Sequence, residues 1–469
     1  MRRGRTALLA IPLLLCFLAP GVGAQDHRLG AVIDAQLDAR VPYKSSLVRG
    51  LYTLPPRASV KQYAPYAGDQ GDHGTCTAWS SAYAATTIIY AKLNGITDRQ
   101  KITQLAFSPG FAFRESFGSQ FPGCAGGQAI PNVLRAIQDN GVPLLTELDS
   151  LCPATLPRQA VDDARPYSIL GFTRLLVPGD TASGALQKIK KSLSEGKPVV
   201  VGMYVDWVDG QGCFHNAPPD YVWKPVRTVT PQAGHAMTIV SYDDAYAGGA
   251  FELENSWGRD WGNDGFFWIR YNDFVDYVHE AFELIENPQM ANIQSQQLSG
   301  ALTLELAGGH RPAVHWNGGS YAVGENLPSG TRFRLYLDNN EPAFVYVIGV
   351  DSEWKTYRLF PSDPSMSPAL TYARNRVALP GEDLFIQTDQ NPGQERIVVL
   401  YSPRELDQAA VERDIEKGTG ELPERIRTAV GGALVPFDHV SYTPNAMSFT
   451  AKGRPNDVVA LLVSFNHTP

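Results

Sequence analysis

Cysteine is scarce in this chain, with five residues among 469. They are Cys16, Cys76, Cys124, Cys152 and Cys213. Their spacing is too wide for the CxxC pairs of zinc sites, and their number is too low for a disulfide scaffold. A zinc module of the CxxC type and a disulfide-stapled small fold are therefore excluded, and each thiol needs its own explanation.

Basic charge is also in short supply. Lys and Arg number 40 against 48 Asp and Glu, which gives a formal net charge of -8. This balance excludes binding to nucleic acid or to an anionic membrane through a broad basic surface. Hydrophobic residues make up 43%, and we find neither internal repeats nor low-complexity tracts. The chain is globular and long enough for roughly two or three domains.

Long apolar runs are missing except near the N-terminus. Three arginines in the first five residues precede an apolar run at 7–19, and small residues follow at 22–24. This pattern predicts a cleaved signal peptide over residues 1–24, which also removes Cys16. The alternative is an uncleaved anchor, which is disfavoured because the run is short for a membrane span. We therefore expect an exported protein, periplasmic or extracellular, without a membrane span.

The remaining chain divides by pattern into four parts. Residues 25–54 form a short N-terminal segment, either a brief pro-segment or a strap. Residues 55–286 have helices early and strands late, which is typical of an α+β domain. The predicted helices start near Cys76, Pro131 and Ser183, and the predicted strands cover 199–203, 235–242, 251–254 and 266–271.

Residues 287–300 are polar, rich in amides and uncharged, as in a linker. From 301 to 469 apolar residues recur with a period of two, which predicts a β-rich, sandwich-like domain. A single helix is expected after the capping pattern that begins at Ser402.

Cys76 has the surroundings of a nucleophile. It follows a glycine-containing turn and begins a predicted helix, whose unpaired amides and dipole stabilise a thiolate. Gln70, just upstream, is placed to bring its side-chain amide beside the Cys76 N–H. Two such donors make an oxyanion hole.

A base and its orienting partner come from later in the chain. His235 opens an apolar strand, and Asn255 follows the next strand. An asparagine oxygen can accept the imidazole N–H and fix the ring without adding charge, while Trp257 can shield that bond from water.

Four motifs in this order resemble those of the papain-like cysteine peptidases. They are Gln70 to Thr77, Gly123 to Gly127, His235-Ala236, and Asn255 to Gly262. The resemblance implies a fold of two lobes, one helical and one β-barrel-like, with a cleft between them. No metal or organic cofactor is implied for the chemistry.

The same resemblance implies roles for individual residues. Cys76 is the expected nucleophile, His235 the base and acid, Asn255 the orienter and Gln70 the oxyanion donor, with Trp257 in support. Gly126, Gly127, Gly234 and Ala236 are the expected substrate contacts.

Two departures from the family pattern concern neighbours of the nucleophile. His73 stands where most members have a cysteine, whose usual partner matches Cys124, and Thr77 replaces a tryptophan. Three thiols then remain for at most one disulfide. Cys124 with Cys152 is favoured because both are expected in the helical lobe, and pairings with Cys213 stay open.

Residues 331–405 resemble a domain of unknown function that is appended to some bacterial caspase-like and papain-like peptidases. The matching stretches are 329–333, 344–351, 359–361 and 379–382. This likeness assigns no chemistry, and the domain is a candidate for contact with a surface or a partner.

These observations predict an exported cysteine peptidase that hydrolyses protein or peptide substrates through a thioester. One alternative is a catalytically weak, peptide-binding pseudo-peptidase. The other is an amidase or transpeptidase with the same nucleophile.

Overall fold

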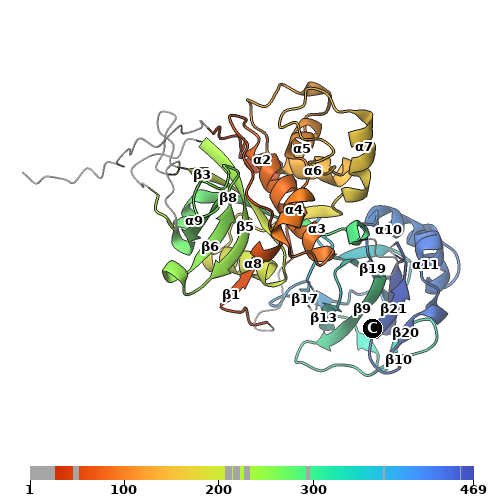
Figure 1. Ribbon diagram of the computed structural model, residues 1–469. Helices are drawn as coiled ribbons and strands as arrows, with labels where there is room; N and C mark the ends of the chain where they lie inside the picture. The colour runs from red at the N-terminus through yellow and green to blue at the C-terminus, as the bar shows by residue number, and fades with distance from the viewer. Residues whose placement is uncertain are drawn as a thin grey trace, which may run out of the picture.

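The structure, a computed structural model, describes residues 27–45, 52–205, 214, 222–225, 233–291, 296–372, 375–454 and 456–469. The predicted signal peptide, Cys213 and residues 292–295 of the predicted linker lie outside these residues. Within them, no helix is long and apolar enough to cross a membrane. Figure 1 shows a group of helices beside a sheet, with a second, strand-rich region below them.

The central helix of the first region starts at the predicted nucleophile. It comprises α2 (Cys76–Ala78), the π-helical stretch η2 (Trp79–Thr86) and α3 (Thr87–Leu93). Around it lie α4 (Arg99–Gln104), α5 (Pro109–Glu115), α6 (Ile130–Asn140) and α7 (Arg158–Ala164). Gly141 ends α6 with a φ of 74°, which a side chain would disfavour.

An eight-stranded sheet packs beside these helices in the order β2-β8-β3-β5-β6-β7-β4, with β1 paired to β5. Its strands are β1 (Arg57–Ser59), β2 (Gly171–Arg174), β3 (Val199–Val205), β4 (Val222–Trp223), β5 (Ala233–Asp243), β6 (Ala250–Glu254), β7 (Phe266–Arg270) and β8 (Val278–Ile285). Helices α8 (Ala182–Ser194) and α9 (Tyr271–Tyr277) complete the region. The predicted α+β fold with a helical and a β lobe is confirmed.

The second region contains two further sheets. One holds β10 (Val314–Trp316), β11 (Tyr321–Val323), β12 (Leu327–Pro328), β14 (Ala343–Val350), β15 (Thr356–Phe360), β16 (Ala369–Leu370), β19 (Gly393–Ser402) and β22 (Val459–Thr468). The other holds β9 (Gln296–Leu306), β13 (Arg332–Asn339), β17 (Asn375–Leu379), β18 (Ile386–Gln387), β20 (Ser441–Tyr442) and β21 (Ser448–Gly453). Apolar residues of both sheets share one buried cluster, as in a sandwich.

Two details of this region differ from the sequence prediction. The described part has two helices instead of one, α10 (Gln408–Lys417) and α11 (Leu422–Val430). The first is capped by Asp407, not by Ser402, because the Asp407 side chain accepts the Ala410 N–H. Residues 296–300, expected in the linker, belong to β9 because the buried alternation reaches back to Leu298.

The N-terminal segment joins both regions. After α1 (Ala35–Ala39), Tyr43 forms bridges with Arg174 in β2 and with Met366 of the C-terminal region. Beyond it, the buried Lys44 ammonium pairs with Glu283 in β8 and contacts the Thr371 hydroxyl. The segment is thus clamped between the two regions.

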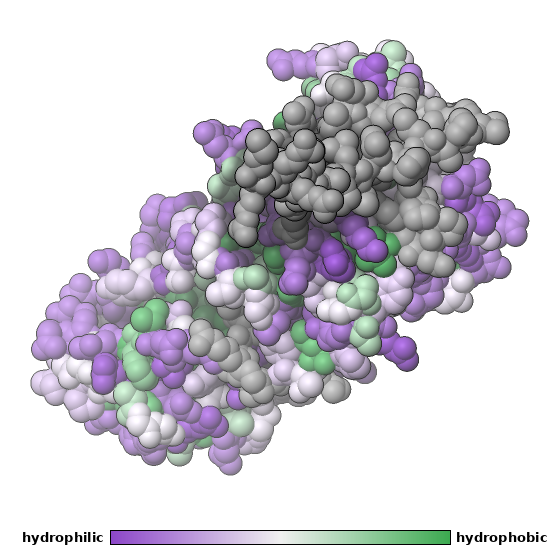
Figure 2. Space-filling view, turned by 90° about the vertical axis from the view of Figure 1, so that its left-hand side faces the viewer, coloured by the Kyte–Doolittle hydropathy of each residue, from purple (hydrophilic) through white to green (hydrophobic). Residues whose placement is uncertain are grey.

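Among the coloured residues on the face in Figure 2, most are hydrophilic, and the apolar ones form separate patches among them. The large apolar side chains of the described residues are instead mostly buried in the clusters between helices and sheets.

Candidate active site

Cys76 lies at the start of the central helix and is fully buried, with 0% of its surface exposed. The helix packs against β5, so the sulfur lies next to the strand that carries His235. The Ala236 amide forms one of the hydrogen bonds that favour the Cys76 thiolate. The tertiary fold thereby brings the predicted nucleophile and the predicted base to one place.

His235 is held in a single orientation by its neighbours. Its Nε2 lies 2.7 Å from the Asn255 Oδ1. The same atom also accepts the Ser256 N–H at 2.8 Å, which identifies it as the oxygen of the Asn255 side-chain amide. It therefore accepts the hydrogen bond from the imidazole. The Trp257 ring covers the histidine with a centroid distance of 5.1 Å. The His235 Nδ1 has no hydrogen-bond partner among the described residues and is therefore the nitrogen free to take a proton.

Gln70 reaches the same place through a network that the sequence analysis missed. Its Oε1 accepts the Ser256 hydroxyl at 2.6 Å, and its backbone N–H donates to the Ser256 carbonyl. Ser256 therefore ties Gln70 to the loop that follows Asn255. The serine stands inside the Asn255 to Gly262 motif, but nothing in its residue type indicated this contact.

The cleft is occupied by the chain itself. Residues 27–34, here called the strap, run across the site as extended backbone. Ala31 donates to the Gly234 carbonyl at 3.0 Å. Gln128 donates to the Gly30 carbonyl at 2.9 Å, and Val32 donates to the Gln128 carbonyl at 3.0 Å. The strap therefore pairs with both sides of the cleft as a short strand.

The strap also takes up a hydrogen bond of Gln70, the predicted oxyanion donor. The Gln70 Nε2 donates to the carbonyl of Arg28 at 2.7 Å. The amide of Gly30 forms a hydrogen bond that favours the Cys76 thiolate. One carbonyl of the strap thus takes the hydrogen bond that a substrate oxyanion would need.

Close backbone approach explains the glycines at these positions. A Cβ on Gly30 would lie 2.0 Å from the Gly74 carbonyl oxygen. A Cβ on Gly127 would lie 2.5 Å from the Gly30 oxygen, and one on Gly234 would lie 2.1 Å from the Ala31 oxygen. Of the predicted substrate contacts, Gly127, Gly234 and Ala236 are buried beside the strap, whereas Gly126 is exposed.

Two side-chain contacts fasten the ends of the strap. The His27 ring stacks on Trp257 at a centroid distance of 5.1 Å, and its Nε2 lies 2.9 Å from Asp69. At the other end, the Asp34 N–H donates to the buried Glu280 carboxyl at 3.1 Å. Burial and the nearby Asp38 carboxylate raise the pKa of Glu280 to about 8.

Burial also sets the charge state of the central pair. It raises the pKa of the Cys76 thiol to about 11, although backbone hydrogen bonds oppose the shift. It lowers the pKa of His235 to about 4, against the effect of the Asn255 hydrogen bond. The helix N-terminus was expected to lower the thiol pKa, but in the covered site desolvation is the larger effect.

Cys124 and Cys152 form a disulfide in the helical lobe. The favoured pairing is thus confirmed, and Cys76 is a free thiol. His73 lies in the turn between Gln70 and Cys76, and its carbonyl accepts the second Gln70 side-chain hydrogen bond at 2.6 Å.

Two family models match this chain. Residues 57–283 match the model described as papain family cysteine protease. Residues 326–405 match a domain of unknown function, DUF4384. A search of curated proteins finds no match.

Solved structures similar to this one include several cysteine proteases. Xylellain, from Xylella fastidiosa, has 20% identity and a TM-score of 0.43 over 58% of this chain and 100% of its own. The bromelain protease from Ananas comosus has 18% identity and a TM-score of 0.39, over 50% of this chain and 100% of its own. Digestive procathepsin L 3 of Tenebrio molitor has 18% identity and a TM-score of 0.41, over 56% of this chain and 77% of its own.

Proposed function

We propose that this chain is a papain-like cysteine peptidase in which Cys76, His235 and Asn255 carry out peptide hydrolysis, because residues 57–283 match the model of papain family cysteine proteases. The observation that supports this most is the 2.7 Å contact between His235 Nε2 and Asn255 Oδ1. Among the described residues, the opposite ring nitrogen has no hydrogen-bond partner, and the strand that carries it packs on the helix that begins at Cys76.

The mechanism follows from these positions. The His235 Nδ1 takes the Cys76 proton, and the thiolate attacks the substrate carbonyl carbon. The Gln70 side-chain amide and the Cys76 N–H hold the oxyanion. His235 then protonates the leaving amine, and water, deprotonated by the same ring, releases the acyl group from the thioester. Asn255 keeps the ring in the tautomer that this transfer requires.

The protein in this conformation is latent. Cys76 and His235 both have 0% exposed surface, and the strap takes the Gln70 hydrogen bond. A substrate can reach the sulfur only after residues 27–34 are displaced or removed. We therefore assign the N-terminal segment a pro-segment role, with the strap as its inhibitory part.

Labelling by a peptidyl epoxide tests the nucleophile and the latency together. We expect slow labelling of Cys76 in the full chain and labelling at least tenfold faster after residues up to 34 are removed, with peptidase activity rising in parallel. The Cys76→Ala variant of the trimmed protein serves as the control and should have neither label nor activity.

Other outcomes would support the alternative functions. A trimmed protein that binds peptides but neither labels nor cleaves them would be a pseudo-peptidase. Products that carry an added amine instead of water would identify a transpeptidase. Equal labelling of full and trimmed protein would contradict latency but not the assignment of Cys76.

Export is part of this proposal. The Cys124–Cys152 disulfide is consistent with it, because disulfides persist in oxidising compartments. Fractionation of cells that express the full chain tests this, and we expect a protein that begins after residue 24, outside the cytoplasm. A cytoplasmic protein with an intact N-terminus would contradict it.

A further inference from the structure

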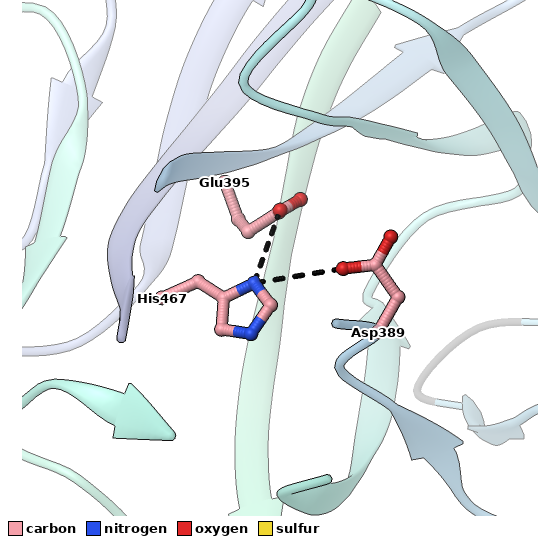
Figure 3. A group of neighbouring side chains, drawn as sticks. All are labelled: Asp389, Glu395 and His467. Atoms are coloured by element: carbon pink, nitrogen blue, oxygen red, sulfur yellow. Dashed lines mark ion pairs between the residues drawn. The ribbon is translucent and has the colours of Figure 1, made fainter. Parts of the chain in front are cut away.

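Three side chains converge at one edge of the C-terminal region, far from the cleft residues in the chain. His467 lies on β22, Glu395 on the paired strand β19, and Asp389 in the turn before β19 (Figure 3). Gly393 pairs with His467, so Glu395, two positions further along, projects from the same face of the sheet. The histidine side chain has 0% exposed surface.

The histidine points its Nδ1 toward the two carboxylates (Figure 3). Its Nε2 lies 2.9 Å from the Ser329 hydroxyl, which itself donates to the Thr468 carbonyl. When the serine donates to this carbonyl and accepts the Nε2 proton, Nδ1 is left with a free lone pair. Nδ1 is buried and has no hydrogen-bond partner among the described residues. It lies 3.5 Å from Glu395 Oε1 and 3.8 Å from Asp389 Oδ1.

Among the described residues, His467 is the basic side chain that faces the two carboxylates. Among the described residues, neither Asp389 nor Glu395 forms an ion pair with a lysine or an arginine. Two carboxylates that face one imidazole leave negative charge in excess even when the ring is protonated. A cation bound between the three groups would balance that charge and would also give the buried nitrogen a partner.

The distances fit a small transition-metal ion. The three candidate ligand atoms all lie within 4.8 Å of one another. A tetrahedral Zn²⁺ with bonds of about 2.0–2.1 Å separates its ligands by about 3.3 Å. Only the half-exposed Asp389 needs to move closer, and the Asn391 amides already orient its carboxylate.

We propose that Asp389, Glu395 and His467 bind a divalent transition cation such as Zn²⁺. An imidazole combined with two carboxylates selects Zn²⁺ or Mn²⁺ over Ca²⁺ and Mg²⁺, which prefer oxygen ligands alone. The Ser329 hydroxyl contacts Nε2 on the other side of the ring and holds the imidazole in the tautomer whose Nδ1 can bind the ion. The bound ion links the last strand of the chain to β19 and to the turn before it.

Calorimetric titration of the full chain with Zn²⁺ tests the site. The protein carries Cys76→Ala, so that the thiol of the cleft does not contribute, and is treated with chelator beforehand. We expect one equivalent to bind through this site. Asp389→Asn and Glu395→Gln, which keep the side-chain shapes, should each lower its affinity at least tenfold.

The matched control is His310→Gln. His310 also lies 3.0 Å from a carboxylate, that of Glu325, but both side chains are exposed, and the described part of the chain offers them no third ligand. Its substitution should leave the titration unchanged. Absence of an equivalent that depends on Asp389 and Glu395, in proteins with the unfolding temperature of the parent, would overturn the proposal.

Discussion

At the scale of single residues, desolvation governs the reactivity of the central pair. A thiol with a pKa near 11 and an imidazole with a pKa near 4 both stay neutral at pH 7. The helix N-terminus and the Asn255 hydrogen bond favour the charged forms, but they are outweighed while the strap excludes water. Exposure of the pair to solvent should reverse this balance.

This reversal can be followed by the pH dependence of thiol alkylation. Removal of residues up to 34 should lower the Cys76 pKa and raise the His235 pKa, because both lose a desolvation penalty. Iodoacetamide should then react with the trimmed protein at a pH well below that needed by the full chain. Identical pH profiles for the two proteins would refute a desolvation effect of the strap.

The proposed role of Gln70 as an oxyanion donor leads to a separate prediction at this scale. In the trimmed protein, Gln70→Ala should lower kcat by about 10²–10³-fold, because one oxyanion donor is lost. Ser256→Ala keeps that donor and removes only its 2.6 Å anchor, so a smaller fall in kcat is expected. Steady-state kinetics on a short peptide distinguishes the two, and equal falls would argue for a purely structural role of Gln70.

At the scale of elements, the strap is held by backbone pairing to glycines rather than by its own side chains. Gly30 is its tightest point because a Cβ there has no space beside the Gly74 carbonyl. The exposed Val32 side chain, in contrast, contributes little to docking. How tightly the strap is held should therefore depend on how closely its backbone fits the cleft.

We expect Gly30→Ala to loosen the strap. Overpacking of this kind costs about 1–3 kcal/mol, so labelling of Cys76 by the epoxide in the full chain should accelerate roughly tenfold or more. Val32→Ala is the matched control and should label like the wild type. Slow labelling of the Gly30 variant would show that the strap is held mainly by contacts elsewhere.

At the scale of the whole molecule, the N-terminal segment connects the peptidase and C-terminal regions. Lys44 lies at the junction, where its ammonium faces Glu283 and also lies over the Tyr372 ring at 3.3 Å. Burial alone would raise the pKa of Glu283, but Lys44 and Lys197 lower it to about 2. The resulting stability is present above the ordinary pKa of 4.5 and is lost as the pH falls toward 2.

Removal of this lysine should destabilise the protein. Lys44→Met leaves the Glu283 carboxylate buried without its nearest cation, which costs about 3–5 kcal/mol of unfolding free energy. Urea denaturation at neutral pH measures the loss. Arg158→Ala removes a charge from a side chain that is 96% exposed and should change stability by less than about 0.5 kcal/mol. Equal effects of the two changes would rule out a stabilising junction.

Much of the fold and part of the site could be predicted from local patterns. The helix that starts at Cys76 and the strand that starts at His235 follow from periodicity. The order of the motifs predicted that Gln70, Cys76, His235 and Asn255 come together. The second C-terminal helix and the start of β9 were missed, since their signals are short or polar.

By itself, the sequence determined the residue types available for chemistry and the local elements that carry them, because propensity, capping and motif order act over neighbouring positions. Only the tertiary structure decided that the strap covers the cleft and that Asp389, Glu395 and His467 meet. These contacts depend on strand pairing and burial between distant segments. The same packing set the charge state of Cys76, since desolvation is a property of the folded surroundings and not of the residue.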